Sequence, residues 1–517
     1  MALITVTSFY FFVLLIVGVI IYYISPRKTQ WIVLLCCSMT YYLLAATNYT
    51  IIFLVISTAI AYVATICIER RKKQGANNRL LFWITMIAII LNVAIWFVLK
   101  GSSFWVNGSV ILNRCFSFFP VLKPAPIVGA LGMGYYTAQV IGYILDVYWD
   151  NIKPQYNPVK LLLFVCFFPQ LTVGPISRYS DLMTLYEPHF VSYQNICFGV
   201  QRILWGLFKK LVISDRVGII VGGIWADTAT YNGIWLWIAV FLYPLQIYTD
   251  FSGCMDIVLG ATELFDIHLK ENFRNPFFSK NSQEFWQRWH ITLGTWARDY
   301  VYYPILKSRF LITLGKKAKK RFGKRIGKFI PWSLGMGILW FVMGFWHGSI
   351  QHIVGVSLWF WVMLILSELL EPLFTFAIKK IGIKTDVFSW HVFQSVRTYT
   401  VYALGAVAFS AVGLSGAISH YKLLLGSFKS WNPWVLFNGS IINLGVTWQD
   451  INLIILGVFI LFFVAVLREK YGYARLWIQK QNVGFRWLIW LVLFSVVLIR
   501  GLYGEGYDAS TFIYQGF

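Results

Sequence analysis

The sequence has few charged residues and very few acidic ones. Only 13% of its 517 residues are Asp, Glu, Lys or Arg, against roughly 25% in a typical soluble domain. Lys and Arg number 44 and Asp and Glu only 21, so the net charge is +23. Because hydrophobic residues make up 58% of the chain, soluble and disordered classes are both excluded. The composition predicts a polytopic membrane protein.

Cysteine pairs and nucleotide-binding motifs are also missing. The seven cysteines lie mostly in apolar runs without a CxxC pair, so the sequence supports neither a zinc site nor a disulfide framework. There is no Walker motif, no dinucleotide fingerprint and no stretch suited to a sizeable soluble domain. We therefore expect no metal, no bound cofactor and no nucleic-acid partner.

Long apolar runs are abundant, and a spanning helix needs roughly 20 mostly apolar residues. Several runs are short or carry polar residues, so we expect an all-α protein with about 10 to 12 transmembrane helices. The first run lacks a basic leading segment and a small-residue cleavage site, which favours a span over a removed signal peptide. The candidate spans are 7–25, 31–46, 50–68, 81–99, 127–148, 159–173, 234–249, 330–346, 351–375, 398–416, 452–467 and 486–500.

The distribution of Lys and Arg predicts the orientation in the membrane. Basic residues follow the first run and fill the loop 70–79, whereas the turn 46–50 between them carries no charge. The loop 468–486 is again basic. We therefore expect a multi-pass protein of the plasma membrane with both termini external.

The segment 306–330 holds ten Lys or Arg residues and no acid, which predicts a cytoplasmic position. Phe322, Ile326, Phe329 and Ile330 recur within it at helical spacing. An amphipathic helix on anionic membrane lipids is the favoured interpretation. Attraction of an anionic cytoplasmic donor is the alternative.

Residues 284–305 are too charged to span lipid freely, so they predict a re-entrant or interfacial helix. Glu284 and Arg288 would form an i,i+4 pair on it. One helical stripe would carry Trp286, Trp289, His290 and Leu293.

Ionisable residues also occur inside apolar runs. His347 lies in GILWFVMGFWHGSIQH (337–352), and such a residue usually faces a cavity and has a function. A purely structural histidine is the alternative, and we expect that role for His352. Asp250 and Asp256 lie in a further apolar run, where structural support is favoured over orienting a histidine or binding a proton or ion.

Five segments together resemble the membrane-bound O-acyltransferase (MBOAT) family. The similarity is to the bacterial alginate and peptidoglycan O-acetyltransferase branch, with the teichoic acid D-alanyl transfer protein as a relative. The segments, in the order of the family, are MGYYTAQVIGYILDVY (133–148), FFPQLTVGPISR (167–178), YTDFSGCMDIVLG (248–260), ENFRNPFFSKNSQEFWQRWHITLGTWARDYVYYPI (271–305) and GFWHG (344–348).

The resemblance implies a fold of membrane helices with re-entrant and interfacial helices around a central tunnel. We expect N-terminal transmembrane helices in 1–126, a catalytic core in 127–375 and further transmembrane helices with an external tail in 376–517. By similarity, His347 matches the catalytic histidine of the family and His290 its second functional histidine. Supporting or substrate-binding positions would be Asp250, Arg288, Trp289, Trp346, Arg298 and Asp299.

The chain ends in TFIYQGF, and the polysaccharide acetyltransferase branch often ends in a similar Phe-Ile-Tyr motif. A phenol, with a pKa near 10, leaves more readily than an alkyl alcohol, so a tyrosyl ester keeps its transfer potential. Tyr514 is therefore a candidate acyl relay. An aromatic tail packed at the membrane interface is the alternative.

The expected function is O-acylation of an extracellular cell-surface polysaccharide from a cytosolic acyl thioester, with His347 as general base. Acetyl-CoA is the expected donor, and an acyl carrier protein thioester is the alternative. The resemblance implies a membrane-anchored extracellular SGNH-type acyltransferase or esterase as partner. D-alanyl transfer to teichoic acid, a transporter of donor or glycan, and a scaffold for an extracellular acyltransferase are the competing hypotheses.

Overall fold

The computed structural model describes residues 5–46, 50–100, 113, 131–348, 350–411 and 413–504. Over these ranges the regular structure is helical, and the single β-interaction is an isolated antiparallel bridge between Phe273 and Trp289. The prediction of an all-α membrane protein is thus confirmed.

The chain forms two compact units, each assembled from separate stretches of sequence. The first contains residues 1–211, 250–270 and 481–517, and the second contains 212–249 and 271–480. The helix α10 (Ile234–Glu263) contributes its first half to the second unit and its second half to the first.

The first unit is built mainly from long apolar helices near the N-terminus. Besides the end of α10, its helices are α1 (Phe9–Ile24), α2 (Gln30–Ala45), α3 (Ile51–Lys73), α4 (Asn78–Lys100), α6 (Met133–Tyr148), α7 (Pro158–Cys166), α8 (Tyr193–Leu207) and α21 (Val483–Arg500).

The second unit contains the segments that the sequence singles out for histidine chemistry. Besides the start of α10, its helices are α9 (Asp215–Ala226), α11 (Ser282–Arg288), α12 (Ile291–Ala297), α13 (Tyr303–Leu306), α14 (Arg309–Trp346), α15 (Ile350–His352), α16 (Trp359–Ile381), α17 (Phe388–Ala406), α18 (Gly413–Gly426), α19 (Trp448–Tyr471) and α20 (Ala474–Gln479).

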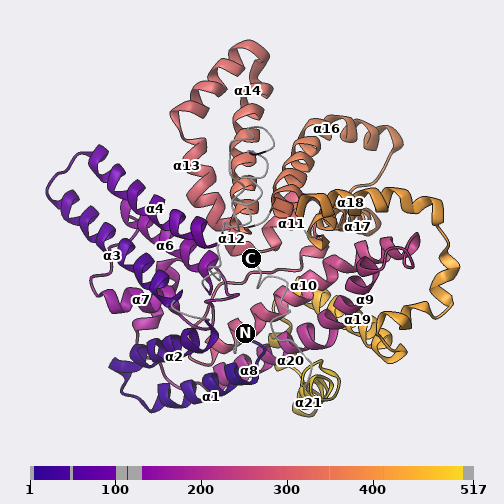
Figure 1. Ribbon diagram of the computed structural model, residues 1–517, viewed down its shortest axis with the longest axis horizontal. Coiled ribbons are helices and arrows are strands. Elements are labelled where there is room, and N and C mark those ends of the chain that lie inside the picture. Colours follow the sequence, from indigo (N-terminus) through magenta and orange to yellow (C-terminus); the bar gives the residue numbers. More distant parts are fainter. Residues whose placement is uncertain are drawn as a thin grey trace. The chain divides into compact units, whose positions relative to one another are not determined.

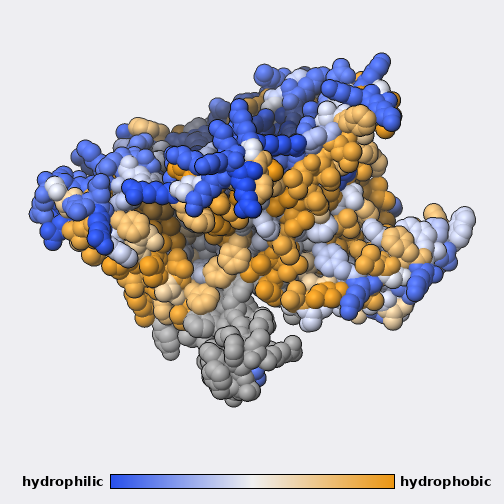
Figure 2. All heavy atoms as spheres, turned by 90° about the horizontal axis from the view of Figure 1, so that it is seen from above, coloured by the Kyte–Doolittle hydropathy of each residue, from blue (hydrophilic) through white to orange (hydrophobic). Residues whose placement is uncertain are grey.

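Among the described residues, seven helical stretches are long and apolar enough to cross a membrane: α3, α4, α10, α14, Ile353–Ile381, α19 and α21. This number is below the expected 10 to 12, because α1, α2 and α6 have 16 residues each and α7 has only nine. Outward apolar side chains such as Phe459, Phe462 and Ile455 on α19 are well exposed, as expected for a lipid-facing surface. Figure 2 shows apolar residues over much of the face in view.

Within the first unit, α8 and the second half of α10 approach closely through glycines. A Cβ on Gly206 would lie 2.5 Å from the carbonyl oxygen of Gly253, and one on Gly199 would lie 2.7 Å from that of Gly260. Small residues at such positions allow membrane helices to pack backbone against backbone.

The same helix pair is joined by buried charges. The π-helix η4 (Phe208–Ser214) continues α8 and presents two consecutive lysines to carboxylates six residues apart on α10. The ion pairs are Lys210–Asp250 at 2.8 Å, Lys209–Asp256 at 2.6 Å, Arg202–Asp256 at 3.0 Å and Arg202–Glu263 at 3.4 Å. Asp250 is therefore held in a buried ion pair, which agrees with the structural role that the sequence favoured for it.

The basic segment is a helical hairpin, so the prediction of one continuous amphipathic helix is wrong. Gly323 has φ of +85° and a non-helical ψ, and the chain reverses there (Figure 1). The two arms touch through glycine, since a Cβ on Gly315 would lie 2.9 Å from the Pro331 side chain and one on Gly327 would lie 2.5 Å from Lys319. All ten basic side chains of 306–330 are exposed.

The segment 284–305 is also not one helix. It consists of α11, a break at residues 289–290, α12, the π-helix η6 (Arg298–Tyr302) and α13. Because His290 has φ of +46°, the predicted stripe that joined it to Trp286 and Leu293 does not exist. The predicted Glu284–Arg288 pair is confirmed at 2.8 Å.

Candidate active site

His347 lies where α14 ends. Gly348 follows with φ of +84°, a conformation that glycine adopts at little cost, and its N–H donates to the carbonyl of Phe345 at 2.9 Å. The imidazole of His347 is buried, with 6% of the residue exposed. Because the C-terminal end of a helix carries partial negative charge, it stabilises a nearby cation by about 0.3–1 kcal/mol. His347 thus caps a helix end that carries partial negative charge.

The helix end is held against η7 (Ile353–Leu358) by a very close contact at Gly344. A Cβ on Gly344 would lie 2.0 Å from Ser357 Oγ and 3.0 Å from the carbonyl oxygen of His352. Ser357 Oγ donates to the carbonyl of Trp340 at 2.5 Å. The first glycine of the GFWHG motif therefore permits the approach that fixes the end of α14.

His347 belongs to a stack of rings. Its ring centroid lies 5.0 Å from that of His352 with 19° between the planes, and His352 lies 4.8 Å from Phe409 at 15°. Two stacked imidazoles repel when both are charged, so protonation of one disfavours protonation of the other. His352, expected to be structural, is thus a direct neighbour of the candidate base.

His290 forms the turn between α11 and α12, and Asn272 holds this turn. The side-chain oxygen of Asn272 accepts from the Thr292 N–H at 3.0 Å and from Thr292 Oγ1 at 2.9 Å. The backbone carbonyl of Asn272 accepts from the Ile291 N–H at 3.0 Å. Nδ1 of His290 lies 3.3 Å from the same side-chain oxygen. The position of the ring is therefore set by a residue 18 positions earlier.

The backbone of His290 is strained and its ring is buried. A positive φ is uncommon for residues other than glycine and costs of order 1–3 kcal/mol, which marks candidate functional positions. Burial lowers the pKa of the imidazole from 6.5 to about 3. His290 is therefore neutral at physiological pH.

Trp346 brings the two candidate histidines together. Its ring lies 6.1 Å from that of His290 with 71° between the planes, and 5.0 Å from that of His347 at 77°. The histidines are 57 residues apart in the sequence, yet both contact one indole. The prediction that folding brings them close is supported by this geometry.

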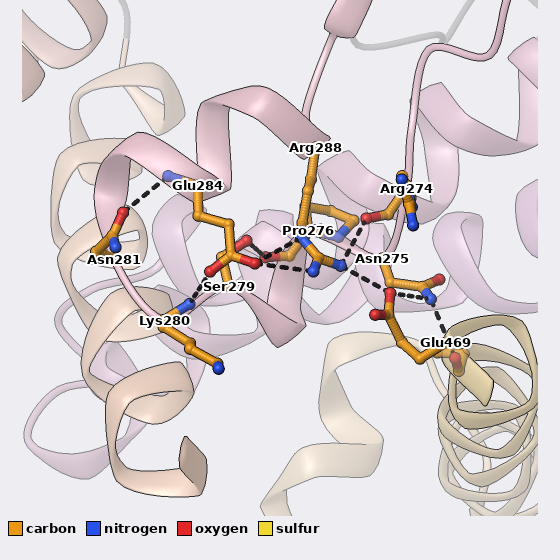
Figure 3. Close-up of polar contacts among 10 residues, drawn as sticks. Arg274, Asn275, Pro276, Ser279, Lys280, Asn281, Glu284, Arg288 and Glu469 are labelled. Atoms are coloured by element: carbon orange, nitrogen blue, oxygen red, sulfur yellow. Dashed lines mark hydrogen bonds and ion pairs between the residues drawn. The ribbon is translucent and has the colours of Figure 1, made fainter. Parts of the chain in front are cut away.

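Arg288, at the end of α11, connects this helix to α19 through an ion pair with Glu469 (Figure 3). It pairs with Glu284 at 2.8 Å and with Glu469 at 2.7 Å, and it donates to the backbone carbonyl of Arg274 at 3.4 Å. Asn275 Nδ2 donates to the same Glu469 carboxylate at 2.9 Å. These contacts give Arg288 a positioning role at the base of the break.

Trp289 is a packing residue at the break, with 2% of it exposed. Its ring stacks on Phe285 at 5.5 Å and contacts the rings of Phe273 and Tyr402 at 5.1 Å. The aromatic cluster holds the end of α11 against the strap of residues 272–274 and against α17.

Arg298, Asp299 and Asp250, which were also predicted to support the site, each take part in an ion pair. Arg298 pairs with the adjacent Asp299 at 2.8 Å on η6, with about half of its side chain exposed. Asp250 belongs to the other unit, where it pairs with Lys210. Tyr514 lies outside the described residues, and the central tunnel remains a prediction.

Two site residues escaped prediction from the sequence. Asn272 lies in the ENFRNPFF stretch, which the sequence offers as part of a motif without any role for this residue. His352 lies five residues after His347. On a continuous helix, side chains three or four residues apart are neighbours, so a spacing of five does not predict a contact. Because α14 stops at the glycine, their stacking could not be read from the spacing.

Residues 131–316 match the MBOAT, membrane-bound O-acyltransferase family. The match includes His290 and its Asn272 anchor and stops before His347. The chain carries an MBOAT domain.

Several named proteins are similar to this chain over much of its length. A probable alginate O-acetylase AlgI of Pseudomonas putida is 27% identical over 390 residues, which is 75% of this chain and 73% of that protein. A probable alginate O-acetylase AlgI of Pseudomonas syringae pv. tomato is 27% identical over 361 residues, and the alignment covers 64% of its length.

Two other relatives are named for different activities. The peptidoglycan O-acetyltransferase of Helicobacter pylori is 29% identical over 324 residues, 57% of this chain and 56% of the relative. The teichoic acid D-alanyltransferase of Bacillus subtilis is 28% identical over 300 residues, 54% of this chain and 72% of the relative. The similarity therefore reaches both acetyl and D-alanyl transferases.

Proposed function

We propose that this protein is a membrane O-acyltransferase that supplies acyl groups for O-acylation of an extracellular cell-surface polysaccharide. The observation that carries the proposal is the meeting of His290 and His347 on the ring of Trp346. The MBOAT match and the acetyl and D-alanyl transferase relatives support it.

In the proposed reaction His347 is the general base. It removes the proton of an attacking hydroxyl as the oxygen bonds to the thioester carbonyl carbon. The tetrahedral intermediate then collapses, the C–S bond breaks, and the leaving thiolate takes up a proton. General-base assistance is typically worth about 10²–10⁴ in rate. The end of α14 stabilises the imidazolium that forms, since it carries partial negative charge.

His290 also contacts the ring of Trp346, and three roles are compatible with this position. It could hold the donor, stabilise the oxyanion or protonate the thiolate. The donor is proposed to be acetyl-CoA, entering from the cytoplasm near residues 284–305. The exposed basic hairpin of α14 would attract its phosphates.

Delivery to the polymer requires a further step outside the cell. Tyr514 is proposed to accept the acyl group and to pass it to a membrane-anchored SGNH-type partner. In the experiment, Tyr514→Phe in whole cells should reduce surface acylation while thioester hydrolysis by the purified protein continues. Unchanged surface acylation would remove the relay.

The central experiment uses purified protein in liposomes with radiolabelled acetyl-CoA. Thioester consumption or covalent labelling should depend on His347, and His347→Ala should abolish it. His391→Ala, a histidine on α17 in the same unit, is the matched control. Retained activity in His347→Ala would refute the assignment, and transport of intact donor without thioester loss would indicate a transporter.

D-alanyl transfer is the second candidate function. It is favoured by the teichoic acid D-alanyltransferase relatives, one of which is 28% identical to this chain over 300 residues. The same assay with a D-alanyl carrier-protein thioester decides between the donors. Mass spectrometry of surface glycans from cells with and without the protein identifies the acyl group delivered.

A further inference from the structure

The contacts around Asn272 determine which nitrogen of His290 carries the proton. The backbone N–H of Thr292 can only donate, so the Asn272 side-chain atom 3.0 Å away must be the amide oxygen and not the nitrogen. An amide oxygen can only accept. The contact of 3.3 Å with His290 Nδ1 therefore requires a proton on Nδ1.

The orientation of the Asn272 side chain is fixed from several sides. Thr292 Oγ1 lies 2.9 Å from the same oxygen, and the Asn272 carbonyl accepts from the Ile291 N–H. Residues next to Asn272 continue the strap, because Phe273 bridges Trp289 and the Arg274 N–H donates to the Arg288 carbonyl at 2.9 Å. Backbone hydrogen bonds to residues before and after His290 therefore hold the strap that carries the Asn272 side chain.

We propose that Asn272 is a positioning residue that locks His290 in the Nδ1–H tautomer, so that Nε2 presents a lone pair to the substrate. Resting on the function proposed above, this selects one of the three roles of His290. A neutral imidazole with a bare Nε2 accepts a hydrogen bond from a substrate N–H or O–H. It neither donates to an oxyanion nor supplies a proton to the thiolate through that atom.

The tautomer can be measured without any activity. In protein labelled with ¹⁵N-histidine and reconstituted in lipid, NMR distinguishes protonated from bare ring nitrogens. The His290 signals are those that disappear in His290→Gln. We expect a protonated Nδ1 and a bare Nε2 in the wild type. A protonated Nε2 with a bare Nδ1 would overturn the proposal.

Three variants separate tautomer control from simple packing. Asn272→Leu removes the acceptor, and the fraction of His290 with a proton on Nδ1 should fall. Asn272→Asp keeps an acceptor and should retain the Nδ1–H form, which provides a second variant if the leucine does not fold. Thr292→Val is the matched control, because it removes another donor to the same oxygen and leaves the His290 contact in place. An unchanged tautomer in Asn272→Leu would refute the assignment.

Kinetics test the role of the lone pair. A hydrogen bond made equally to substrate and transition state changes KM and leaves kcat unaffected. Since a neutral hydrogen bond contributes about 0.5–1.5 kcal/mol, we expect KM of the thioester or acceptor to rise about 2- to 13-fold in Asn272→Leu. A loss confined to kcat would indicate an acid or oxyanion role and overturn the inference. A wild type that consumes no thioester would defeat the proposed function alone, since the NMR result would stand.

Discussion

Removing Lys210 should destabilise the protein far more than removing an exposed lysine. Lys210 Nζ lies 2.8 Å from Asp250 Oδ1, and only 2% and 1% of the two side chains are exposed. At that separation and an effective dielectric constant of about 20, the attraction is about 6 kcal/mol. Much of this offsets the cost of taking both charges out of water, so the whole value does not appear as net stability.

The change Lys210→Met keeps most of the side-chain volume and removes the charge. It takes from the Asp250 carboxylate its partner in a buried site, a change that typically costs about 3–5 kcal/mol. Lys210→Met with Asp250→Asn removes both charges, so most of that loss should be recovered. The control is Lys73→Met, which removes the exposed i,i+4 partner of Glu69, where about 0–1 kcal/mol is expected.

The free energies of unfolding can be compared by denaturation with SDS in mixed micelles at one pH and one salt concentration. The wild type, Lys210→Met, Asp250→Asn and the double variant form a double-mutant cycle for Lys210 and Asp250. If Lys210→Met loses no more stability than Lys73→Met, or if the double variant is less stable than either single one, the argument from buried charge is refuted.

Three further outcomes are expected. Gly344→Ala places a methyl group 2.0 Å from Ser357 Oγ and should cost about 1–3 kcal/mol in the same denaturation assay, and adding Ser357→Ala should recover part of it. His352→Phe keeps a stack on Phe409 and should change kcat by less than about threefold, whereas a loss as large as that in a variant without the base would assign His352 to the chemistry. The pKa of His290 is about 3 in the folded protein, against 6.5 for an imidazole in the unfolded chain. Between these two pH values the unfolded chain binds one proton more than the folded protein, so the free energy of unfolding falls as the pH falls from 6.5 to about 3. The slope should reach up to about 1.4 kcal/mol per pH unit and should flatten in His290→Gln, and equal slopes in both proteins would contradict the buried neutral ring.

Features that depend on residues close together in the sequence could be predicted from it. The apolar runs predicted the membrane helices, and the spacing of Glu284 and Arg288 predicted their ion pair. The ten basic side chains of 306–330 are exposed, because a charge without a buried partner is costly to remove from water.

Features that depend on distant contacts could not be predicted. The positive φ of His290 is maintained by Asn272, whose hydrogen bonds form only after the chain has folded back. The contacts of Trp346 with two histidines likewise depend on tertiary packing. The hairpin of the basic segment does have a sequence signal, because Gly315, Gly323 and Gly327 interrupt its helical pattern.

The second arm of the α14 hairpin separates the basic turn from the histidine at its other end. From Lys324 to Trp346 the helix has 23 residues, which at 1.5 Å per residue is about 34 Å. The Debye length at physiological ionic strength is about 8 Å, so four such lengths lie between the turn and His347. Because the lysines and arginines are exposed to solvent ions, screening weakens their influence on the distant reacting atoms. Their field acts on the approach of an anion, so neutralising them should lower the association rate and its dependence on ionic strength, while turnover at saturation stays the same.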